Sequence, residues 1–496
     1  MSEPFLEQAI EWEAAARPLV VECAKFPAPP FMPGVTKVTI ARDDNLQLTL
    51  VAEGVLKDSP ELGRRREEQD AIPLGAFYPA VETSFDAYGA RLDLKMHLEH
   101  VPSSLVMTGR ESRFTQRGSP FRLRRTWANK LVLGINELPD SEALLAPAWM
   151  SDWYINGATH IRFTNRTTRR RATSFARERK FQTVDLPGGG GLGGAWDHIV
   201  VDAPGLRFAL SQVPEEHAAG DLRAVSLDFL APFPDLETRS ALGEIVSFVL
   251  GRRMMRVGST TFDPTGSVIE EESVNPWGSN IRTLCRSADH PPVPFHYDGA
   301  ALELLLVDLV PRYLAAREPL GLSDALWSYW IAKESPASID LPIFAAAVEA
   351  LKRNWFSSTR SKSKGLHMSK DAFDAITGDL IAELQKRLQE KGAADEIGRT
   401  LAGANRMGFT VQLRAFFDEI KLTVGKREKA ALDARHRSAH GAGAEEELEN
   451  LARFGNAYRT LFDRVFLRLL GYEGRYVDRT TEGHPLRDLS DAAGGS

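Results

Sequence analysis

Hydrophobic and polar residues alternate along much of the first half of the chain. In RLDLKMHLEH (91–100), leucine or methionine stands at every second position from Leu92 to Leu98. GVTKVTIARDDNLQLTLVAEG (34–54) alternates in the same way after its Asp-Asp-Asn turn, and WDHIVVDAPGLRFALSQV (196–213) contains two such runs around Pro-Gly. A period of two is typical of half-buried strands, and the frequent turn signals favour a sandwich or barrel-like β domain over βαβ units.

The pattern changes to a helical period in two parts of the chain. LETRSALGEIVSFVLGRRMMR predicts a helix from Leu236 to Arg256, and STTFDPTGSVIEEE (259–272) predicts a hairpin after it. Beyond the proline-broken segment SADHPPVPFHYDG (287–299), the long segments are all helical in period. ALELLLVDLVPRYLAA (301–316) is apolar nearly all round, which predicts a buried helix.

The clearest predicted helix is EEELENLARFGNAYRTLFDRVFLRLLGY (445–472). Three glutamates open it, as the helix dipole favours. Its apolar residues recur at steps of three and four: Leu448, Leu451, Phe454, Tyr458, Leu461, Phe462, Val465 and Leu469. The tail that begins at Asp488 is expected to be frayed.

Together these patterns predict an α+β protein. A β-rich domain, sandwich or barrel-like, is expected over residues 1–286, followed by a linker over 287–299. An all-α bundle is expected over residues 300–490, and a flexible tail over 491–496.

Composition narrows the class of protein. The 496 residues are 43% hydrophobic and 26% charged, as in an ordinary globular protein of two or three domains. No apolar run approaches the roughly 20 residues that span a bilayer, and the start lacks the features of a signal peptide. With only two cysteines, Cys23 and Cys285, we expect a reduced cytoplasmic protein without a disulfide, a zinc site or membrane association.

Charge is unevenly distributed along the chain. The whole sequence has a net charge of −6, but residues 101–180 alone carry +9. Within them, RTTRRRATSFARERK (166–180) could follow a phosphate backbone, with Arg169, Arg170 and Arg171 as candidate RNA contacts. The alternative is an exposed basic strand or loop that binds nothing.

Two other motifs predict no ligand. LPGGGGLGGAWD (186–197) contains a formal G-x-G-x-x-G, but a strand pattern follows it where a dinucleotide site needs a helix, so we interpret it as a hairpin loop. The histidines His97 and His100, and His290 and His296 near Asp298, lack the spacing that a metal demands. We therefore expect neither a metal nor another cofactor.

An arginine followed after four to six residues by a histidine occurs four times, about as often as chance allows: Arg91/His97, Arg360/His367, Arg435/His440 and Arg479/His484. Context favours Arg435/His440. In ARHRSAHG (434–441), His436 follows the arginine, small residues precede His440, and a helix-ending glycine comes after it. Strong helices are predicted on both sides, so a bundle could hold both side chains.

ARHRSAHG resembles the R-x4-6-H signature of HEPN domains, all-α bundles that are often endoribonucleases. That family favours a polar residue after the arginine, small residues before the histidine and glycine after it; His436 departs from its commonest residue, asparagine. With the long helix that ends in LRLLGYEGRY (467–476), the region is similar to the C-terminal HEPN domain of ApeA-type abortive-infection proteins. ALGEIVSFVLGRRMMRVGSTTFD (241–263) and the β-rich region before it resemble the N-terminal domain of the same proteins.

The resemblance implies RNA cleavage without a metal, by attack of the 2′-OH on the neighbouring phosphate. Histidine titrates near neutrality and can transfer protons, whereas arginine stays charged and can stabilise the phosphorane. We expect Arg435 to bind phosphate, His440 to transfer protons, His436 to orient or share that transfer, and Arg437 to contact RNA. Because each chain offers one motif, the resemblance also implies a homodimer with both motifs at one cleft.

The expected substrate is host or phage RNA, with tRNA loops as candidates because their bases are accessible. A freely active cytoplasmic nuclease would be toxic, so the β-rich half is expected to sense a phage-derived trigger or to restrain the nuclease. The alternative is a non-catalytic HEPN scaffold that dimerises, with a β-rich half that binds a ligand or phage component.

Overall fold

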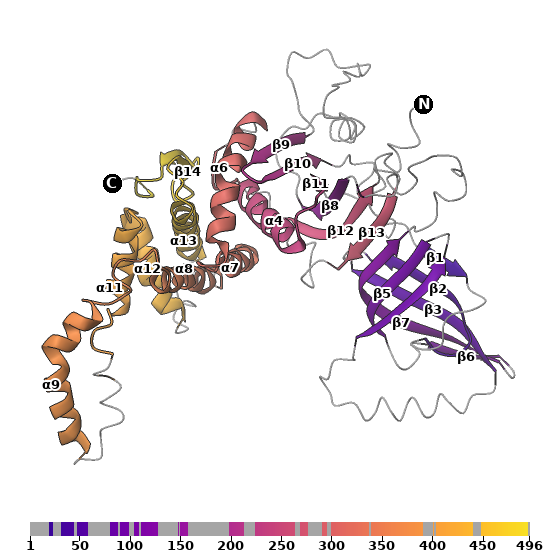
Figure 1. The fold of residues 1–496 in the computed structure, drawn as a ribbon, viewed down its shortest axis with the longest axis horizontal. Coiled ribbons are helices and arrows are strands. Elements are labelled where there is room, and N and C mark those ends of the chain that lie inside the picture. Colours follow the sequence, from indigo (N-terminus) through magenta and orange to yellow (C-terminus); the bar gives the residue numbers. More distant parts are fainter. Residues whose placement is uncertain are drawn as a thin grey trace, which may run out of the picture. The chain divides into compact units, whose positions relative to one another are not determined.

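The computed structural model describes the core elements of both halves of the chain (Figure 1). The described residues are 19–22, 31–43, 47–57, 80–87, 90–98, 104–108, 111–126, 147, 149–156, 198–212, 224–262, 268–275, 290–294, 299–336, 339–389, 400, 403–439 and 448–494.

Strands dominate the first half of the described chain. They are β1 (Leu19–Glu22), β2 (Val35–Arg42), β3 (Leu48–Lys57), β4 (Val81–Ala87), β5 (Ala90–Leu98), β6 (Ser104–Thr108), β7 (Glu111–Thr126), β8 (Trp149–Ile155), β9 (His198–Ala203), β10 (Leu206–Gln212), β11 (Val225–Leu230), β12 (Met255–Phe262) and β13 (Val268–Val274). Two short strands, β14 (Arg475–Val477) and β15 (Leu486–Asp488), pair near the C-terminus.

The described helices lie mostly in the second half of the chain. They are α4 (Leu236–Leu250), which lies among the strands, and then α6 (Gly299–Arg317), α7 (Leu322–Glu334), α8 (Asp340–Ser357), α9 (Lys370–Gln389), α11 (Phe409–Glu419), α12 (Lys426–Ala439) and α13 (Leu448–Leu469). A sheet-rich region followed by helices is the expected α+β class.

The thirteen strands β1 to β13 form one antiparallel sheet, ordered β1-β2-β3-β7-β13-β12-β8-β11-β10-β9, with β4, β5 and β6 attached beside this path. The long strand β7 has two partners on each edge: β3 and then β13 on one, β6 and then β5 on the other. The partner strand on each edge of β7 changes near Gly118, which pairs with Leu50 of β3 and with Leu98 of β5.

Alternation along β5 is confirmed. Leu92, Leu94, Met96 and Leu98 are buried, whereas Arg91 and His97 are exposed. The inward residues of β1, β2, β3, β5 and β7 share one hydrophobic core. The hairpin of β9 and β10 is confirmed as well, with Gly205 at a φ of 76° in its turn.

The helix predicted from Leu236 to Arg256 is wrong at its C-terminal end. Asp235 caps its start, where its carboxylate accepts a hydrogen bond of 2.7 Å from the Thr238 N–H. Gly251 ends it in the left-handed conformation, at a φ of 67°. Arg256 therefore belongs to β12, in which the backbone is extended.

The expectation that residues 301–316 form a helix buried all round is also wrong. One side of α6 is buried, at Leu302, Leu306, Leu309 and Tyr313, but Leu304 is 71% exposed. Composition alone does not reveal which face of an apolar helix has a partner.

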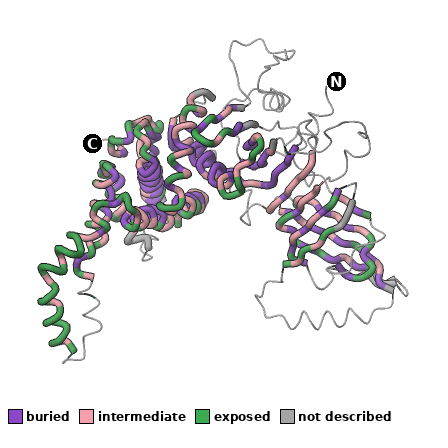
Figure 2. Tube along the Cα trace, viewed as in Figure 1, coloured by how far each residue is buried: buried purple, intermediate pink, exposed green. Residues whose placement is uncertain are grey.

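Helix α13 is confirmed, and much of it is buried (Figure 2). Leu451, Tyr458, Leu461 and Val465 are fully or almost fully buried. The segment after it is packed rather than frayed. Leu489 and Ala493 are buried, and the Gly494 N–H donates a hydrogen bond of 2.8 Å to Asp478 Oδ2. The buried carboxylate of Asp478 thus fixes residues that composition marked as a flexible tail.

The chain separates into two compact units, one of residues 1–288 and 295–307 and the other of residues 289–294 and 308–496. We call them the sheet unit and the helical unit. The division falls within α6, close to the expected linker at 287–299.

Candidate functional site

Arg435 lies in the last described turns of α12. His436 and Arg437 continue the helix backbone, but their side chains lie outside the described residues, as does all of His440. Arg435 is therefore the part of the ARHRSAHG motif whose surroundings the structure defines.

The guanidinium of Arg435 is held by two other helices. It forms an ion pair with Glu349 of α8, and its central carbon lies 4.1 Å from the ring centroid of Phe409, the first residue of α11. The side chain of Arg435 is only 13% exposed. A planar guanidinium stacked on an aromatic face and paired with a carboxylate is held in one place.

Lys352 and Tyr458 complete this group, which we call the Arg435 cluster: Glu349, Lys352, Phe409, Arg435 and Tyr458. The Lys352 ammonium lies 4.1 Å from the Phe409 ring centroid, so one ring contacts two cations. Burial lowers the pKa of Lys352; Glu349 opposes that shift and Arg435 adds to it. Burial raises the pKa of Tyr458 to about 12, although the nearby Arg435 guanidinium acts to lower it, so the phenol is neutral at physiological pH.

The helical periods explain why these residues meet. Glu349 and Lys352 are three positions apart on α8, so they lie on one face. Tyr458 lies within the buried stripe of α13, which packs against α8 and α12. Glu349, Lys352 and Phe409 were not predicted from the sequence, although one charge within the apolar run IFAAAVEAL (343–351) and another directly after it were a usable signal.

A groove of about 810 Å³ opens between α11 and α12, and Phe409 contributes to its wall. Its lining combines apolar residues such as Leu413 and Phe417 with exposed charges. The charges are Arg414, Lys421 and Lys429 against Asp418 and Asp433. A groove of this size is within the range of small-molecule sites, and it adjoins the Arg435 cluster through the Phe409 ring.

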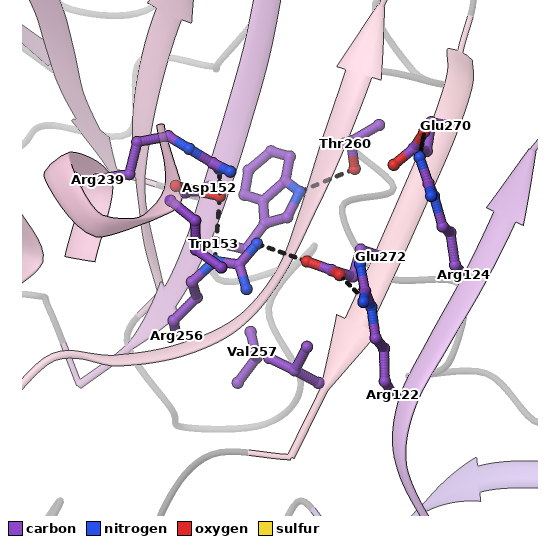
Figure 3. Close-up of polar contacts among 12 residues, drawn as sticks. Arg122, Arg124, Asp152, Trp153, Arg239, Arg256, Val257, Thr260, Glu270 and Glu272 are labelled. Atoms are coloured by element: carbon purple, nitrogen blue, oxygen red, sulfur yellow. Dashed lines mark hydrogen bonds and ion pairs between the residues drawn. The ribbon is translucent and has the colours of Figure 1, made fainter. Parts of the chain in front are cut away.

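The sheet unit holds a second polar group, a chain of alternating charges (Figure 3). Asp152 of β8 is fully buried, and its Oδ1 accepts hydrogen bonds from Arg239 of α4 at 2.6 Å and from Arg256 of β12 at 3.1 Å. Arg256 also donates to Glu272 of β13 at 2.8 Å, and Glu272 pairs with Arg122 of β7 at 2.6 Å. This charge chain connects one helix with four strands.

Opposite charges in this group offset the cost of burial for Glu272 and Arg256. Burial acts to raise the pKa of Glu272, but Arg256 and Arg122 outweigh it and lower that pKa. Burial acts to lower the pKa of Arg256, and Asp152 and Glu272 raise it. The neighbouring strand positions add further pairs, Arg124 with Glu270 and Arg125 with Glu271.

These pairs change the interpretation of the basic segment 101–180. Three of its arginines, Arg122, Arg124 and Arg125, face the glutamates of β13. Much of the local positive charge on β7 is therefore neutralised within the sheet. Arg169, Arg170 and Arg171 lie outside the described residues, as does the glycine-rich segment 186–197.

The other Arg/His pairs have different surroundings. Arg479 is buried, forms an ion pair with Asp463 and donates a hydrogen bond of 2.6 Å to the His290 carbonyl, while the rings of His290 and His484 meet edge-on at 5.3 Å. These contacts tie residues 290–294 to the helical unit.

Arg91 and His97 are exposed on β5, as are Arg360 and His367 in the loop after α8. The histidine candidates His100 and His296, with Asp298, lie outside the described residues.

No family model, curated protein or solved structure matches the chain. Among the described helices, none is both long and apolar enough to cross a membrane.

Proposed function

We propose that the chain is a metal-independent endoribonuclease of HEPN type that acts in anti-phage defence by abortive infection. The observation that supports this most is the position of Arg435. It is held between helices and stacks on Phe409, which lines the groove, and it stands one residue before His436 and five before His440. An arginine so placed suits the binding of a phosphate rather than a purely solvated role.

The chemistry needs three groups. RNA supplies the 2′-OH nucleophile, His440 transfers protons to and from the reacting oxygens, and Arg435 stabilises the negative charge that develops on the phosphorane. Cleavage by this route leaves a 2′,3′-cyclic phosphate. His436 would orient or share the proton transfer, and two motifs from a homodimer would supply an acid and a base.

Glu349 forms an ion pair with the same guanidinium that would bind the phosphate. A carboxylate presents two oxygens to arginine much as a phosphate does, so substrate binding would replace one anionic partner of Arg435 by another. Phe409 would remain as the stacking partner and keep the guanidinium plane in place. Arg414, Lys421 and Lys429 in the groove would then contact the flanking phosphates.

The test is cleavage of total RNA, including tRNA, by the purified full chain in EDTA. His440→Ala is expected to lower the rate by about 10²–10⁴, the typical contribution of acid-base catalysis. Arg435→Ala is expected to lower it by about 10²–10³, the typical loss when one group that stabilises developing negative charge is removed. Arg360→Ala and His367→Ala are matched controls, because they alter an Arg/His pair of similar spacing on an exposed loop. Equal cleavage by all variants, or equal phage protection by wild type and His440→Ala, would refute the nuclease.

We propose that the sheet unit senses a phage-derived trigger or restrains the nuclease. Expression of residues 289–496 alone, which keep the segment that packs on Arg479, should then be more toxic than expression of the full chain at equal protein level. The His440→Ala form of the same fragment is the control. If the fragment is no more toxic, restraint by the sheet unit is wrong.

The burial of Arg435 favours one alternative, a non-catalytic HEPN scaffold. An arginine that is 13% exposed and paired with Glu349 and Phe409 can serve packing alone. In that case Arg435→Ala lowers stability, while His440→Ala leaves stability, assembly and phage protection unchanged.

A further inference from the structure

Helix α9 presents an apolar stripe along its whole length that has no cover in the described chain. None of its 20 residues is buried. Ile376 is 65% exposed, Leu380 70% and Leu384 40%. With Phe373, Ile381 and Leu388, they recur at steps of three and four and so fall on one face of the helix.

The base of this helix is firmly attached to the helical unit. Asn405 is buried; its side-chain amide donates to the Met368 carbonyl at 3.0 Å, and its side-chain oxygen accepts from the Met368 N–H at 3.2 Å. Leu366 and Arg406 form a β-bridge beside them. Residues on both sides of α9 are therefore joined, and the helix extends from that junction, exposed along its length (Figures 1 and 2).

An isolated helix of this length, about 30 Å, gains little from propensity alone, since helices in proteins are stabilised mostly by packing of an apolar face. An exposed stripe of large aliphatic residues on an anchored helix therefore indicates a partner.

The distribution of charge indicates a second copy of the same helix. The first ten residues of α9 carry three aspartates and one lysine, whereas the last ten carry one glutamate, Lys386 and Arg387. Antiparallel pairing brings the acidic half of one helix beside the basic half of the other, and parallel pairing would place like charges together. A two-fold axis generates this complementarity from one sequence.

We infer that α9 is a dimerisation arm that packs antiparallel against α9 of a second copy of the chain. The midpoint of the stripe from Phe373 to Leu388 falls at Leu380 and Ile381, so the two-fold axis passes there. Leu380 of one copy then lies near Leu380 of the other, and Phe373 lies near the partner's Leu388. This surface is independent of Arg435 and of the proposed cleavage.

Sedimentation of the full chain tests the inference. Wild type is expected to have at least twice the mass of one chain at micromolar concentration. Leu380→Asp is expected to halve that mass by raising the dissociation constant of this interface at least about 100-fold. Ala375→Asp is the matched control, because it places the same residue on the opposite face of α9, and it should keep the mass of wild type. A monomeric wild type, or a Leu380→Asp chain with the same mass as wild type, would overturn the inference.

Cysteine cross-linking tests whether the two α9 helices pair antiparallel, without relying on a variant that weakens the helix. With Cys23 and Cys285 replaced by serine, Leu380→Cys should cross-link to itself across the dimer. Phe373→Cys should not cross-link to itself but should do so when mixed with Leu388→Cys. Self-cross-linking through position 373 would mean a parallel pair. Leu432 lines the groove between α11 and α12. A cross-link from position 380 to a Leu432→Cys chain would therefore place α9 in the groove of the other copy, and either result overturns the antiparallel arm.

Discussion

Arg435 stacks on Phe409, with its guanidinium carbon 4.1 Å from the ring centroid, and α11 thereby fixes a side chain of α12. Glu349 adds an ion pair from α8. Two of these helices, α11 and α12, also frame the groove. The position of the motif arginine is thus set by residues that lie outside the motif.

Removal of the Glu349 charge should free Arg435 for phosphate. Glu349→Gln keeps the shape of the side chain but withdraws the competing carboxylate. We expect about fivefold faster RNA cleavage at low substrate concentration, corresponding to about 1 kcal/mol. Glu383→Gln makes the same chemical change on exposed α9 and should leave the rate unchanged. A large loss of activity in Glu349→Gln would instead make Glu349 a positioning residue.

The effects on stability of Phe409 and of Lys352, one of the two cations that contact its ring, should depend on each other. Phe409→Leu is expected to cost about 1–2 kcal/mol of unfolding free energy through the lost cation–π contacts. Lys352→Met should then alter stability in the wild-type background by a different amount from its effect in Phe409→Leu. A double-mutant cycle measured by urea unfolding checks this. Additive effects would mean that the ring and the ammonium contribute independently.

The Arg464–Glu428 ion pair should be essential to the helical unit. Both side chains are fully buried at 2.5 Å, and Arg464 also donates to the carbonyls of Thr423 and Leu489. Arg464→Met leaves the Glu428 carboxylate buried without its partner, which should cost about 3–5 kcal/mol. The unfolding transition followed by circular dichroism measures this loss.

Arg453→Met is the matched control for that substitution, because Arg453 pairs with Glu449 on the exposed face of the same helix. It should change stability by less than about 1 kcal/mol. Adding Glu428→Gln to Arg464→Met should recover part of the loss. A double variant no more stable than Arg464→Met would mean that the other hydrogen bonds of Arg464 dominate.

The sequence predicted elements more reliably than it predicted their ends and partners. Strand β5 and helix α13 followed from local periods, because one face of each is buried along its length. The end of α4 depended on Gly251, whose left-handed backbone outweighed the helical period of the residues after it. The packed tail could not be foreseen, since it depends on the buried carboxylate of Asp478.

The candidate site was only partly predictable for the same reason. Spacing and neighbouring residues selected Arg435, but Glu349 and Phe409 are 86 and 26 positions away along the chain. Their contact with Arg435 arises from the packing of α8, α11 and α12, which no short motif encodes. Likewise, the sequence does not show that the arginines of β7 form ion pairs with Glu270, Glu271 and Glu272, because these contacts depend on the pairing of β7 with β13.

Asp340 should make the helical unit less stable as the pH rises. Its carboxylate lies at the start of α8, where it accepts a hydrogen bond of 2.7 Å from the Leu341 N–H, and a Cβ on Gly455 of α13 would collide with its Oδ2. Burial raises the pKa of Asp340 to about 7, from about 3.9 in an unfolded chain. Below about pH 4 both states are protonated and Asp340 costs nothing. Between about pH 4 and 7 the unfolded state loses its proton first, so the penalty grows, and above pH 7 it is complete.

Asp340→Asn keeps the acceptor for Leu341 and removes the charge. It should therefore raise the unfolding free energy at pH 8 by about 1–2 kcal/mol, after allowance for solvent screening, and have little effect at pH 4. Urea unfolding at the two pH values measures the difference. Asp371→Asn, at the exposed start of α9, is the control for the chemical change itself. An equal effect of Asp340→Asn at both pH values would show that it acts through packing against Gly455 rather than through the proton.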